Sequence, residues 1–304
     1  MLVTIFGGGG FLGRYVAQEL LAQGARVRIA ERDPGAAMRI KPLGPLGQVQ
    51  LVHADVRDPQ SVVRAVAGSD AVINLVALLS GPVDAVNHHG AANVAQAATA
   101  AGVGALVHVS AIGADAGSAS AYGRSKGQGE AAVLATFPQA TIVRPSVLFG
   151  PEDLFTNRLG AMCRLPFVPV VAPETRFQPV YVVDVARAVA AAALAPERYA
   201  GSVYELGGPQ VFTMLELARW IAADTGRKDA VVAVPGVLAA LLARLPFVPL
   251  TVDQWKMLAH DAVVSADAKG LSEFGVAPTP LAAVSEGWLV KYRKHGRFTA
   301  HAEI

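Results

Sequence analysis

Strand-like runs alternate with amphipathic segments through the first 150 residues of the chain. The strand-like runs lie at residues 3–6, 25–30, 49–53, 71–76, 105–109 and 141–144, and helical patterns lie between them, most clearly at 11–23, 84–101 and 119–137. Apolar strands separated by helices are typical of a parallel sheet that is covered on both faces. The pattern therefore predicts an α/β fold with a doubly wound parallel sheet of the Rossmann type.

The alternation is interrupted once and weakens after residue 150. Residues 34–48 are rich in Pro and Gly, and they predict a loop with little regular structure. Further along, Asp184 is expected to cap an alanine-rich helix over 185–194. Thr213-x-x-Glu216 is a capping box, which predicts that another helix begins there.

The composition narrows the class of protein and the number of domains. Hydrophobic residues make up 53% of the 304 residues and charged residues 16%, so we expect a large core and no extensive disorder. The net charge of +2 gives no reason to expect a nucleic acid as partner. We expect residues 1–150 to form the Rossmann core, 177–195 to return to it, and the rest of 151–304 to form a smaller C-terminal α/β lobe.

Cysteine, histidine and hydropathy bear on the compartment and on metal binding. The single cysteine, Cys163, lacks a nearby basic cluster, so we expect a buried thiol in a reducing, cytoplasmic compartment. The chain starts directly in its first strand, so no secretion signal is expected, and no apolar run has the length of a bilayer-spanning helix. The mean hydropathy of +0.40 keeps peripheral membrane contact open. His88 and His89 would point about 100° apart on a helix, so no metal site is expected.

Four consecutive glycines join the first strand to the first helix. They can be aligned as Gly7-x-x-Gly10-x-x-Gly13 or as Gly8-x-Gly10-x-x-Gly13. Either spacing permits a tight turn, a close approach of the backbone to a pyrophosphate, and close packing of the helix on the strand. The helix N-terminus supplies N–H groups and positive potential for the phosphates. This stretch predicts a dinucleotide-binding site.

The end of the second strand bears on which dinucleotide is bound. Glu31 follows Gly13 by 18 positions, near the distance expected for an acid that binds the ribose 2′-hydroxyl. Arg32 suits a 2′-phosphate instead, with Arg14 as a second phosphate contact. Strand alternation is expected to send Glu31 and Arg32 to opposite sides, and a solvated strand end is the simpler interpretation of Glu31. We favour NADP(H), with NAD(H) as the alternative. Asp55-Val56 is expected at the adenine edge, unless it is an ordinary turn.

One helix contains a candidate pair for acid–base chemistry. Tyr122 and Lys126 are four residues apart, so they share a helix face. A nearby cation is expected to lower the tyrosine pKa from its usual value near 10. Ser110, which ends the fifth strand, completes the candidate catalytic set, and the same three residues are expected to contact the cofactor.

A hexapeptide occurs twice in the second half of the chain, at 164–169 and at 244–249, as Arg-Leu-Pro-Phe-Val-Pro. Two prolines in six residues exclude a regular helix interior, so each copy predicts an apolar loop that begins with a basic residue. Chance repetition, with both copies packed in the smaller lobe, is one interpretation. The other is an apolar lip that contacts a membrane or a membrane-bound partner.

Several motifs together point to a family. The glycine pattern, Asp55-Val56, Asn87-x-x-Gly90-x-x-Asn93, Tyr122 with Lys126, and RPSVLFGP resemble the extended short-chain dehydrogenase/reductase superfamily. The resemblance runs nearly end to end, because YELGGPQVFTMLELARWIAADTG is similar to that group's C-terminal region. Within the superfamily the chain most resembles the nucleotide-binding accessory subunits of respiratory complex I and their bacterial relatives. The stretches that carry this likeness are VTIFGGGGFLGRYV, KPLGPLGQV, VINLV, FGPEDLFTN and QPVYVVDV.

The resemblance implies a tightly bound NADPH with a structural role and no established turnover. It implies that Lys126 hydrogen bonds the nicotinamide ribose. It also implies cofactor contacts from Phe11, Leu12, Leu75, Val76, Ala77, Asn93, Val109, Pro145 and Val147.

One departure from the family pattern bears on catalysis. Active relatives usually carry Ser or Thr one or two residues after the serine that ends strand five, whereas here Ala111 and Ile112 follow Ser110. Ser110 itself, or Ser118 or Ser120 in the next loop, would have to replace the missing hydrogen-bond donor to a carbonyl substrate.

Two functions therefore remain open. The first is a catalytically weak NADP(H)-binding accessory subunit, docked on a respiratory complex or peripheral on the inner membrane face. The second is an NAD(P)-dependent oxidoreductase or epimerase/dehydratase that uses Tyr122 and Lys126 on a small carbonyl, quinone or sugar-nucleotide substrate.

Overall fold

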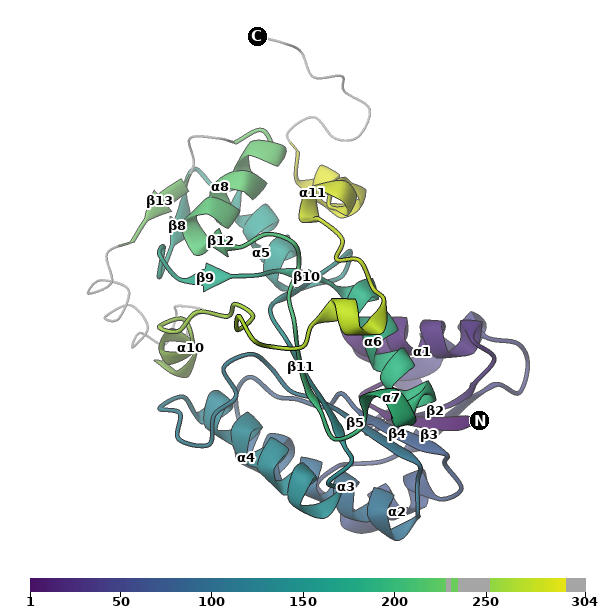
Figure 1. Ribbon diagram of the computed structural model, residues 1–304. Coiled ribbons are helices and arrows are strands. Elements are labelled where there is room, and N and C mark those ends of the chain that lie inside the picture. Colours follow the sequence, from purple (N-terminus) through teal and green to yellow (C-terminus); the bar gives the residue numbers. More distant parts are fainter. Residues whose placement is uncertain (228–230, 235–251, 294–304) are drawn as a thin grey trace. The chain divides into compact units, whose positions relative to one another are not determined.

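The computed structural model describes residues 1–227, 231–234 and 252–293, and the chain divides into two compact units (Figure 1). The first unit comprises Met1–Pro145, Val182–Leu206 and Val264–Ala277. The second unit comprises Ser146–Tyr181, Gly207–Val263 and Pro278–Ile304.

The first unit is built on a seven-stranded parallel sheet in the order β11-β6-β5-β4-β1-β2-β3. The strands are β1 (Leu2–Phe6), β2 (Arg26–Glu31), β3 (Val49–His53), β4 (Ala71–Asn74), β5 (Ala105–Val109), β6 (Thr141–Pro145) and β11 (Val203–Leu206). The strand order reverses between β1 and β4, and ligands bind at such a switch point in open α/β sheets. The predicted Rossmann-type sheet is confirmed.

Helices cover both faces of this sheet (Figure 1). One face carries α2 (Pro59–Val66), α3 (Ala91–Ala100) and α4 (Ala121–Thr136), and the other carries α1 (Phe11–Ala22) and α6 (Val182–Leu194). Strand residues such as Phe6, Val72 and Leu106 are buried against Val62 of α2 and Val94 of α3. The short elements α7 (Pro196–Tyr199) and η4 (Leu271–Phe274) complete the unit.

Three local predictions were wrong. Residues 34–43 form a 3-10 helix, η1 (Pro34–Leu43), where a loop was predicted; the Asp33 carboxylate accepts a hydrogen bond from the Gly35 N–H, and Ala37 and Ile40 are buried. Helix α6 begins at Val182, so Asp184 lies inside its first turn and is fully buried rather than acting as the cap.

The third difference is the segment expected as one helix over 84–101. It begins with a π-helical turn, η2 (Asp84–Gly90), and continues as α3. The turn packs directly on α4: a Cβ on Gly129 would lie 2.2 Å from the Asn87 carbonyl oxygen. The π-helical turn, which is wider than an α-helical turn, therefore lies at the point where η2 contacts α4.

The second unit has its own core. Phe149, Phe177, Leu217, Ile221 and Trp288 are among the side chains buried together there. Its strand pairs are β7 (Leu148–Phe149) with β10 (Val180–Tyr181), β8 (Val168–Val170) with β13 (Val231–Ala233), and β9 (Arg176–Phe177) with β12 (Phe212–Thr213). Its helices are α5 (Phe155–Met162), α8 (Met214–Asp224), α10 (Val252–Met257), α11 (Leu281–Val284), α12 (Glu286–Leu289) and the 3-10 turn η5 (Val290–Tyr292).

Two predictions for this unit are confirmed, and one is wrong in part. Thr213 and Glu216 form the reciprocal capping box at the start of α8, and Cys163 is buried in the core, where burial raises its pKa. The first hexapeptide copy is only partly a loop, because its last residues belong to β8. The second copy, 244–249, lies outside the described residues.

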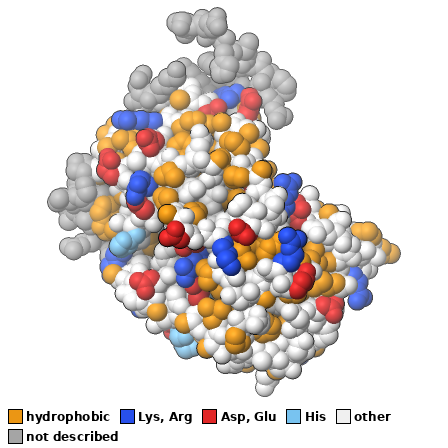
Figure 2. All heavy atoms as spheres, in the orientation of Figure 1, with side chains coloured by type: hydrophobic (Ala, Val, Ile, Leu, Met, Phe, Trp, Pro, Cys, Tyr) orange, Lys and Arg blue, Asp and Glu red, His pale blue; other side chains and the backbone are white. Residues whose placement is uncertain are grey.

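The surface adds two observations. On the face shown in Figure 2, basic and acidic side chains are interspersed among apolar ones, in keeping with the net charge of +2. Within the part of the chain that the structure describes, no helix combines the length and apolar character needed to cross a bilayer.

Candidate functional site

The glycine turn after β1 has the geometry that a bound pyrophosphate requires. Gly7 has φ +79°, and a Cβ on Gly13 would lie 2.4 Å from the Gly7 carbonyl oxygen. Gly10 is the N-cap of α1 and provides no side-chain cap, so the first N–H groups of the helix are left for a ligand. Gly7 needs the left-handed backbone conformation and Gly13 the close contact, so the structure favours the Gly7-x-x-Gly10-x-x-Gly13 alignment.

A pocket of about 360 Å³ opens beside this turn, at the carboxyl ends of β1 to β4. Its lining includes Gly7 and Gly10 of the turn and the predicted cofactor residues Glu31, Arg32, Asp55, Val56, Leu75, Val76 and Ala77. Residues that the sequence did not single out also line it: Gly9, Ala30, Ala36, Ala37, Ala54, Arg57, Leu78 and Val86. A glycine cradle beside a pocket of this kind fits a dinucleotide.

Glu31 and Arg32 face the same pocket rather than opposite sides. Glu31 ends β2, so strand alternation does not extend to Arg32. The Glu31 carboxylate accepts a 2.6 Å hydrogen bond from the Gly9 N–H, and its burial raises its pKa. It is therefore not a solvated strand end. The Arg39 guanidinium donates to the Gly9 carbonyl at 2.5 Å, so the glycine turn is held by both charges.

Two arginines differ in their availability for a phosphate. Arg32 lines the pocket and forms no hydrogen bond or ion pair with the described residues. Arg14 lies with its guanidinium 4.9 Å from the centre of the Tyr15 ring and donates to the Tyr15 hydroxyl, and it is not part of the pocket lining. Arg32 is therefore the better placed of the two predicted phosphate contacts.

Asp55 and Val56, which line the pocket, are fixed there by local hydrogen bonds. Asp55 accepts from Arg57, with a shortest distance of 2.6 Å, and this bond lowers the Asp55 pKa. The Asn93 amide donates to the Val56 carbonyl at 2.8 Å. Asn93 is thus placed behind the pocket wall, where it positions Val56, and it does not line the pocket. Arg57 could have been suspected from its place two residues after Asp55.

The loop after β4 is anchored from two directions. The Asn74 side-chain oxygen accepts from the Val76 N–H at 3.1 Å. Asn87 binds the backbone of Leu78 through both its oxygen and its nitrogen, and also donates to Ser125 of α4. This loop forms the middle of the pocket wall, so η2 and α4 support it.

The predicted catalytic residues lie on α4 and at the end of β5. Lys126 is buried, and its Nζ donates to the Val109 carbonyl at 2.8 Å; burial lowers its pKa to about 8. Burial raises the pKa of Tyr122 to about 12, so the predicted lowering was wrong. Desolvation of the phenolate outweighs any effect of the neighbouring ammonium.

The nearby serines have different roles. Ser120 caps α4 by accepting from the Gly123 N–H, and the Ser118 hydroxyl accepts from the Ser120 N–H, so both hold the loop. The Ser110 hydroxyl is buried and has no hydrogen-bond partner among the described residues. A buried hydroxyl without a partner is costly, so it fits a ligand contact at this position.

His108 supplies a second buried polar atom of the same kind. The Asn74 amide nitrogen lies 3.2 Å from His108 Nδ1, so Nδ1 accepts and the proton lies on Nε2. Burial lowers the His108 pKa well below its usual value, and within the described chain Nε2 has no partner. His108 lies on β5 and Ser110 is the first residue after that strand, so both polar atoms belong to its carboxyl end.

The remaining predicted cofactor residues are not part of the pocket lining. They are Phe11, Leu12 and Gly13 at the start of α1, Val109 and Ser110 at the end of β5, Tyr122 and Lys126 on α4, Pro145 at the end of β6, and Val147 in the second unit. Their contacts with a cofactor stay predictions.

A protein-family model described as NAD(P)H-binding matches residues 7–159. The chain belongs to the NAD(P)H-binding family. It is 35% identical to the mitochondrial NADH dehydrogenase [ubiquinone] 1 alpha subcomplex subunit 9 of Arabidopsis thaliana, over 97% of this chain and 79% of that protein. It is 30% identical to a ceramide reductase of Caulobacter vibrioides, over 98% of this chain and 92% of that protein.

Solved structures share the fold. A dTDP-glucose 4,6-dehydratase from Streptomyces venezuelae with NAD bound superimposes with a TM-score of 0.72 at 21% identity, covering 97% of each chain. The predicted resemblance to complex I accessory subunits is confirmed, as is an NAD(P) cofactor class, and the likeness to extended short-chain dehydrogenases is confirmed at the level of the fold.

The raised pKa of Glu31 yields a test of its position. A carboxyl whose pKa is higher in the folded state than in the unfolded state adds stability below its unfolded pKa, and this stability is lost as the pH rises through the folded pKa. Glu31→Gln keeps an oxygen for the Gly9 N–H and has no charge. We therefore expect the variant to gain stability relative to wild type as the pH rises from about 4.5 to 7.5, measured as the free energy of unfolding in urea without cofactor.

Glu216→Gln is the matched control. Hydrogen bonds from Thr213 lower the Glu216 pKa, so this variant should lose stability relative to wild type as the pH rises towards about 4.5, and the difference should change little above that pH. A Glu31→Gln difference that is flat with pH, or that has the same sign as the control, would contradict the buried placement of Glu31.

Proposed function

We propose that the chain is an NADP(H)-binding accessory protein with little or no turnover, which docks on a respiratory complex at the inner, cytoplasmic face of the membrane. The observation that carries the proposal is a contrast within the first unit. The glycine turn and its charged pocket are complete, whereas Lys126 is buried, Tyr122 is half-buried, and the Tyr122 pKa is raised rather than lowered.

The charges around the adenosine end favour NADP(H). Three guanidinium groups (Arg32, Arg39 and Arg57) accompany two carboxylates (Glu31 and Asp55). Both carboxylates are engaged, one with the Gly9 N–H and one with Arg57. Arg32 is left to bind a 2′-phosphate, for which a guanidinium is the best side chain.

The state of Tyr122 and Lys126 favours weak catalysis. A phenol with a pKa of about 12 is not a base at neutral pH. The Lys126 ammonium donates a hydrogen bond to the Val109 carbonyl oxygen. Burial lowers its pKa to about 8, so its charged form is less stable than that of an exposed lysine. Ala111 and Ile112 add no donor at the position where active relatives carry Ser or Thr. When bound, the nicotinamide would supply a hydride, and these residues would orient its ribose.

A second candidate is an active reductase. The partnerless hydroxyl of Ser110 and the Nε2–H of His108 favour it, because each could bind a carbonyl oxygen. The protonated phenol of Tyr122 could still donate a proton to an alkoxide. The relative from Caulobacter vibrioides, which is matched over 92% of its own length, is named as a ceramide reductase. The substrate of an active reductase would therefore be a ketone, with quinones and sugar nucleotides as the alternatives.

The proposed docking surface is the apolar lip expected from the hexapeptides at 164–169 and 244–249. Only the first copy lies within the described residues, where its exposed side chains Leu165 and Phe167 are joined by Val232. Leu165 is 52% exposed, Phe167 59% and Val232 52%, all in the second unit. Val232 pairs with Pro169 in the β8–β13 ladder, so the strand pair extends the lip. The relatives named as NADH dehydrogenase subunits support a respiratory complex as the partner.

Arg32→Ala tests the cofactor. A charge-assisted hydrogen bond contributes about 1.5–3 kcal/mol, so NADPH affinity should fall about tenfold or more while NADH affinity stays within about twofold. Fluorescence titration measures both. Arg26→Ala, at the exposed opposite end of β2, is the control and should change neither. An equal loss for both nucleotides in Arg32→Ala would speak against a 2′-phosphate contact.

Tyr122→Phe tests turnover. We expect the wild-type protein to oxidise no more than about one equivalent of NADPH with quinones, ketones or sugar nucleotides, and Tyr122→Phe to behave identically, because the phenol is not activated. Tyr292→Phe in the second unit is the control. Sustained turnover that Tyr122→Phe abolishes, with NADPH binding retained, would replace the first proposal by the reductase.

Leu165→Ser combined with Phe167→Ser tests docking. Burial of such a side chain contributes about 1.5–3 kcal/mol, so association with membrane fractions should fall at least about tenfold. Co-sedimentation from the protein's own cells measures it. Leu154→Ser changes a side chain of the same unit that is 86% exposed and should have no effect. Unchanged sedimentation of the double variant would exclude the lip as the contact.

A further inference from the structure

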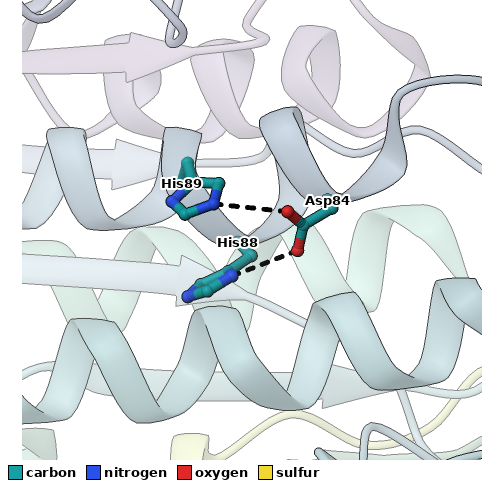
Figure 3. Close-up of side chains that lie close together, drawn as sticks. All are labelled: Asp84, His88 and His89. Atoms are coloured by element: carbon teal, nitrogen blue, oxygen red, sulfur yellow. Dashed lines mark hydrogen bonds and ion pairs between the residues drawn. The ribbon is translucent and has the colours of Figure 1, made fainter.

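Asp84, His88 and His89 gather on the outer side of the π-helical turn η2 (Figure 3). His88 Nδ1 lies 3.1 Å from Asp84 Oδ1, and His89 Nε2 lies 3.3 Å from Asp84 Oδ2. The two rings stack with their centres 4.3 Å apart. The expectation that these rings diverge by about 100° was wrong, because it assumed an α-helix.

The π turn explains why adjacent histidines reach one carboxylate. A π-helix bonds residue i to i+5 and has roughly 4.4 residues per turn. One turn after Asp84 therefore falls between positions 88 and 89, so the two side chains flank Asp84 from either side. In an α-helix, with 3.6 residues per turn, only His88 would lie next to Asp84. The cluster thus depends on a backbone feature that the packing of η2 on α4 maintains.

We propose that these three side chains form a binding site for a divalent transition-metal ion, of which Zn²⁺ is the type. Two imidazoles and one carboxylate are a donor set for zinc, and three protein ligands leave a fourth position for water. Bonds of about 2.0–2.2 Å in a tetrahedron place neighbouring donor atoms about 3.3–3.5 Å apart. Each ring nitrogen lies near this spacing from one of the two Asp84 oxygens, at 3.1 and 3.3 Å, and the ligand atoms of all three side chains lie within 4.8 Å of one another.

The hydrogen bond between His88 and Asp84 and the ion-pair contact between His89 and Asp84 hold the three side chains near their binding positions. The ring planes are 24° from parallel, so one imidazole must rotate for both in-plane lone pairs to meet one ion. His89 is 64% exposed and can make that rotation. His88 is 28% exposed and is more restricted. Exposed ligands also give the ion a direct path from solvent.

The inner side of the same turn belongs to the dinucleotide pocket. Val86 lines the pocket, and Asn87 holds the backbone of Leu78 in its wall. An ion bound to residues 84, 88 and 89 would stabilise the π turn from outside while these two residues support the pocket from inside. The metal site itself does not depend on the proposed function.

Zinc titration tests the proposal. The full-length, untagged protein would compete for Zn²⁺ with a chromophoric chelator. The buffer would contain millimolar Mg²⁺ to occupy nonspecific carboxylate sites, because Mg²⁺ binds poorly to imidazoles. We expect one strong site per chain. His88→Ala, His89→Ala and Asp84→Ala should each weaken it at least about tenfold, because even the loss of a supporting residue costs about 10–100-fold at such sites. His260→Ala, an exposed histidine of the second unit, should leave the affinity unchanged.

Unfolding curves in EDTA show that each variant is folded, and Co²⁺ in place of Zn²⁺ reports the coordination geometry by its visible spectrum. Zinc affinity that is unchanged in His88→Ala or in His89→Ala would overturn the three-ligand site. Binding lost in all three variants, with tetrahedral Co²⁺ bands in wild type only, would support it.

Discussion

The constraint on which the dinucleotide pocket depends is the close contact between the start of α1 and the turn that leads into it. Gly13 approaches Gly7 so closely that a single methyl group would meet the Gly7 carbonyl oxygen at 2.4 Å. This contact sets the position of α1 on the sheet and leaves the N–H groups at the helix start open. The turn lines the pocket, and two of the charged side chains beside it, Glu31 and Arg39, are hydrogen bonded to the turn.

Charge is distributed unequally along the site. The adenosine end has guanidinium and carboxylate groups in mutual contact, with Arg32 left over. Outside the pocket lining, α4 and the end of β5 carry a lysine that donates to a backbone carbonyl, a tyrosine whose pKa is raised, and atoms of Ser110 and His108 that have no hydrogen-bond partner among the described residues. The first arrangement suits binding. The state of the residues on α4 and at the end of β5 is the reason to propose that the site binds the nucleotide and does not turn it over.

Much of the fold could be predicted because its signals are local. Alternation of strands and helices, the glycine spacing at 7, 10 and 13, and the Thr213–Glu216 capping box each act within a few residues, and each is found as predicted. The orientation of Glu31 and Arg32 was missed because the chain leaves the strand between them. The pKa of Tyr122 and the π turn at 84–90 were missed because burial and packing against α4 decide them, and neither is visible in a window of sequence.

If the protein binds NADP(H) and does not turn it over, protein isolated from its own cells should still contain the nucleotide. Untagged protein would be purified from its own cells without added nucleotide, denatured, and its released nucleotides quantified by liquid chromatography and mass spectrometry. The account predicts about one NADP(H) per chain, retained through purification. Release of NAD(H) alone, or protein that emerges empty and binds both nucleotides equally, would contradict it.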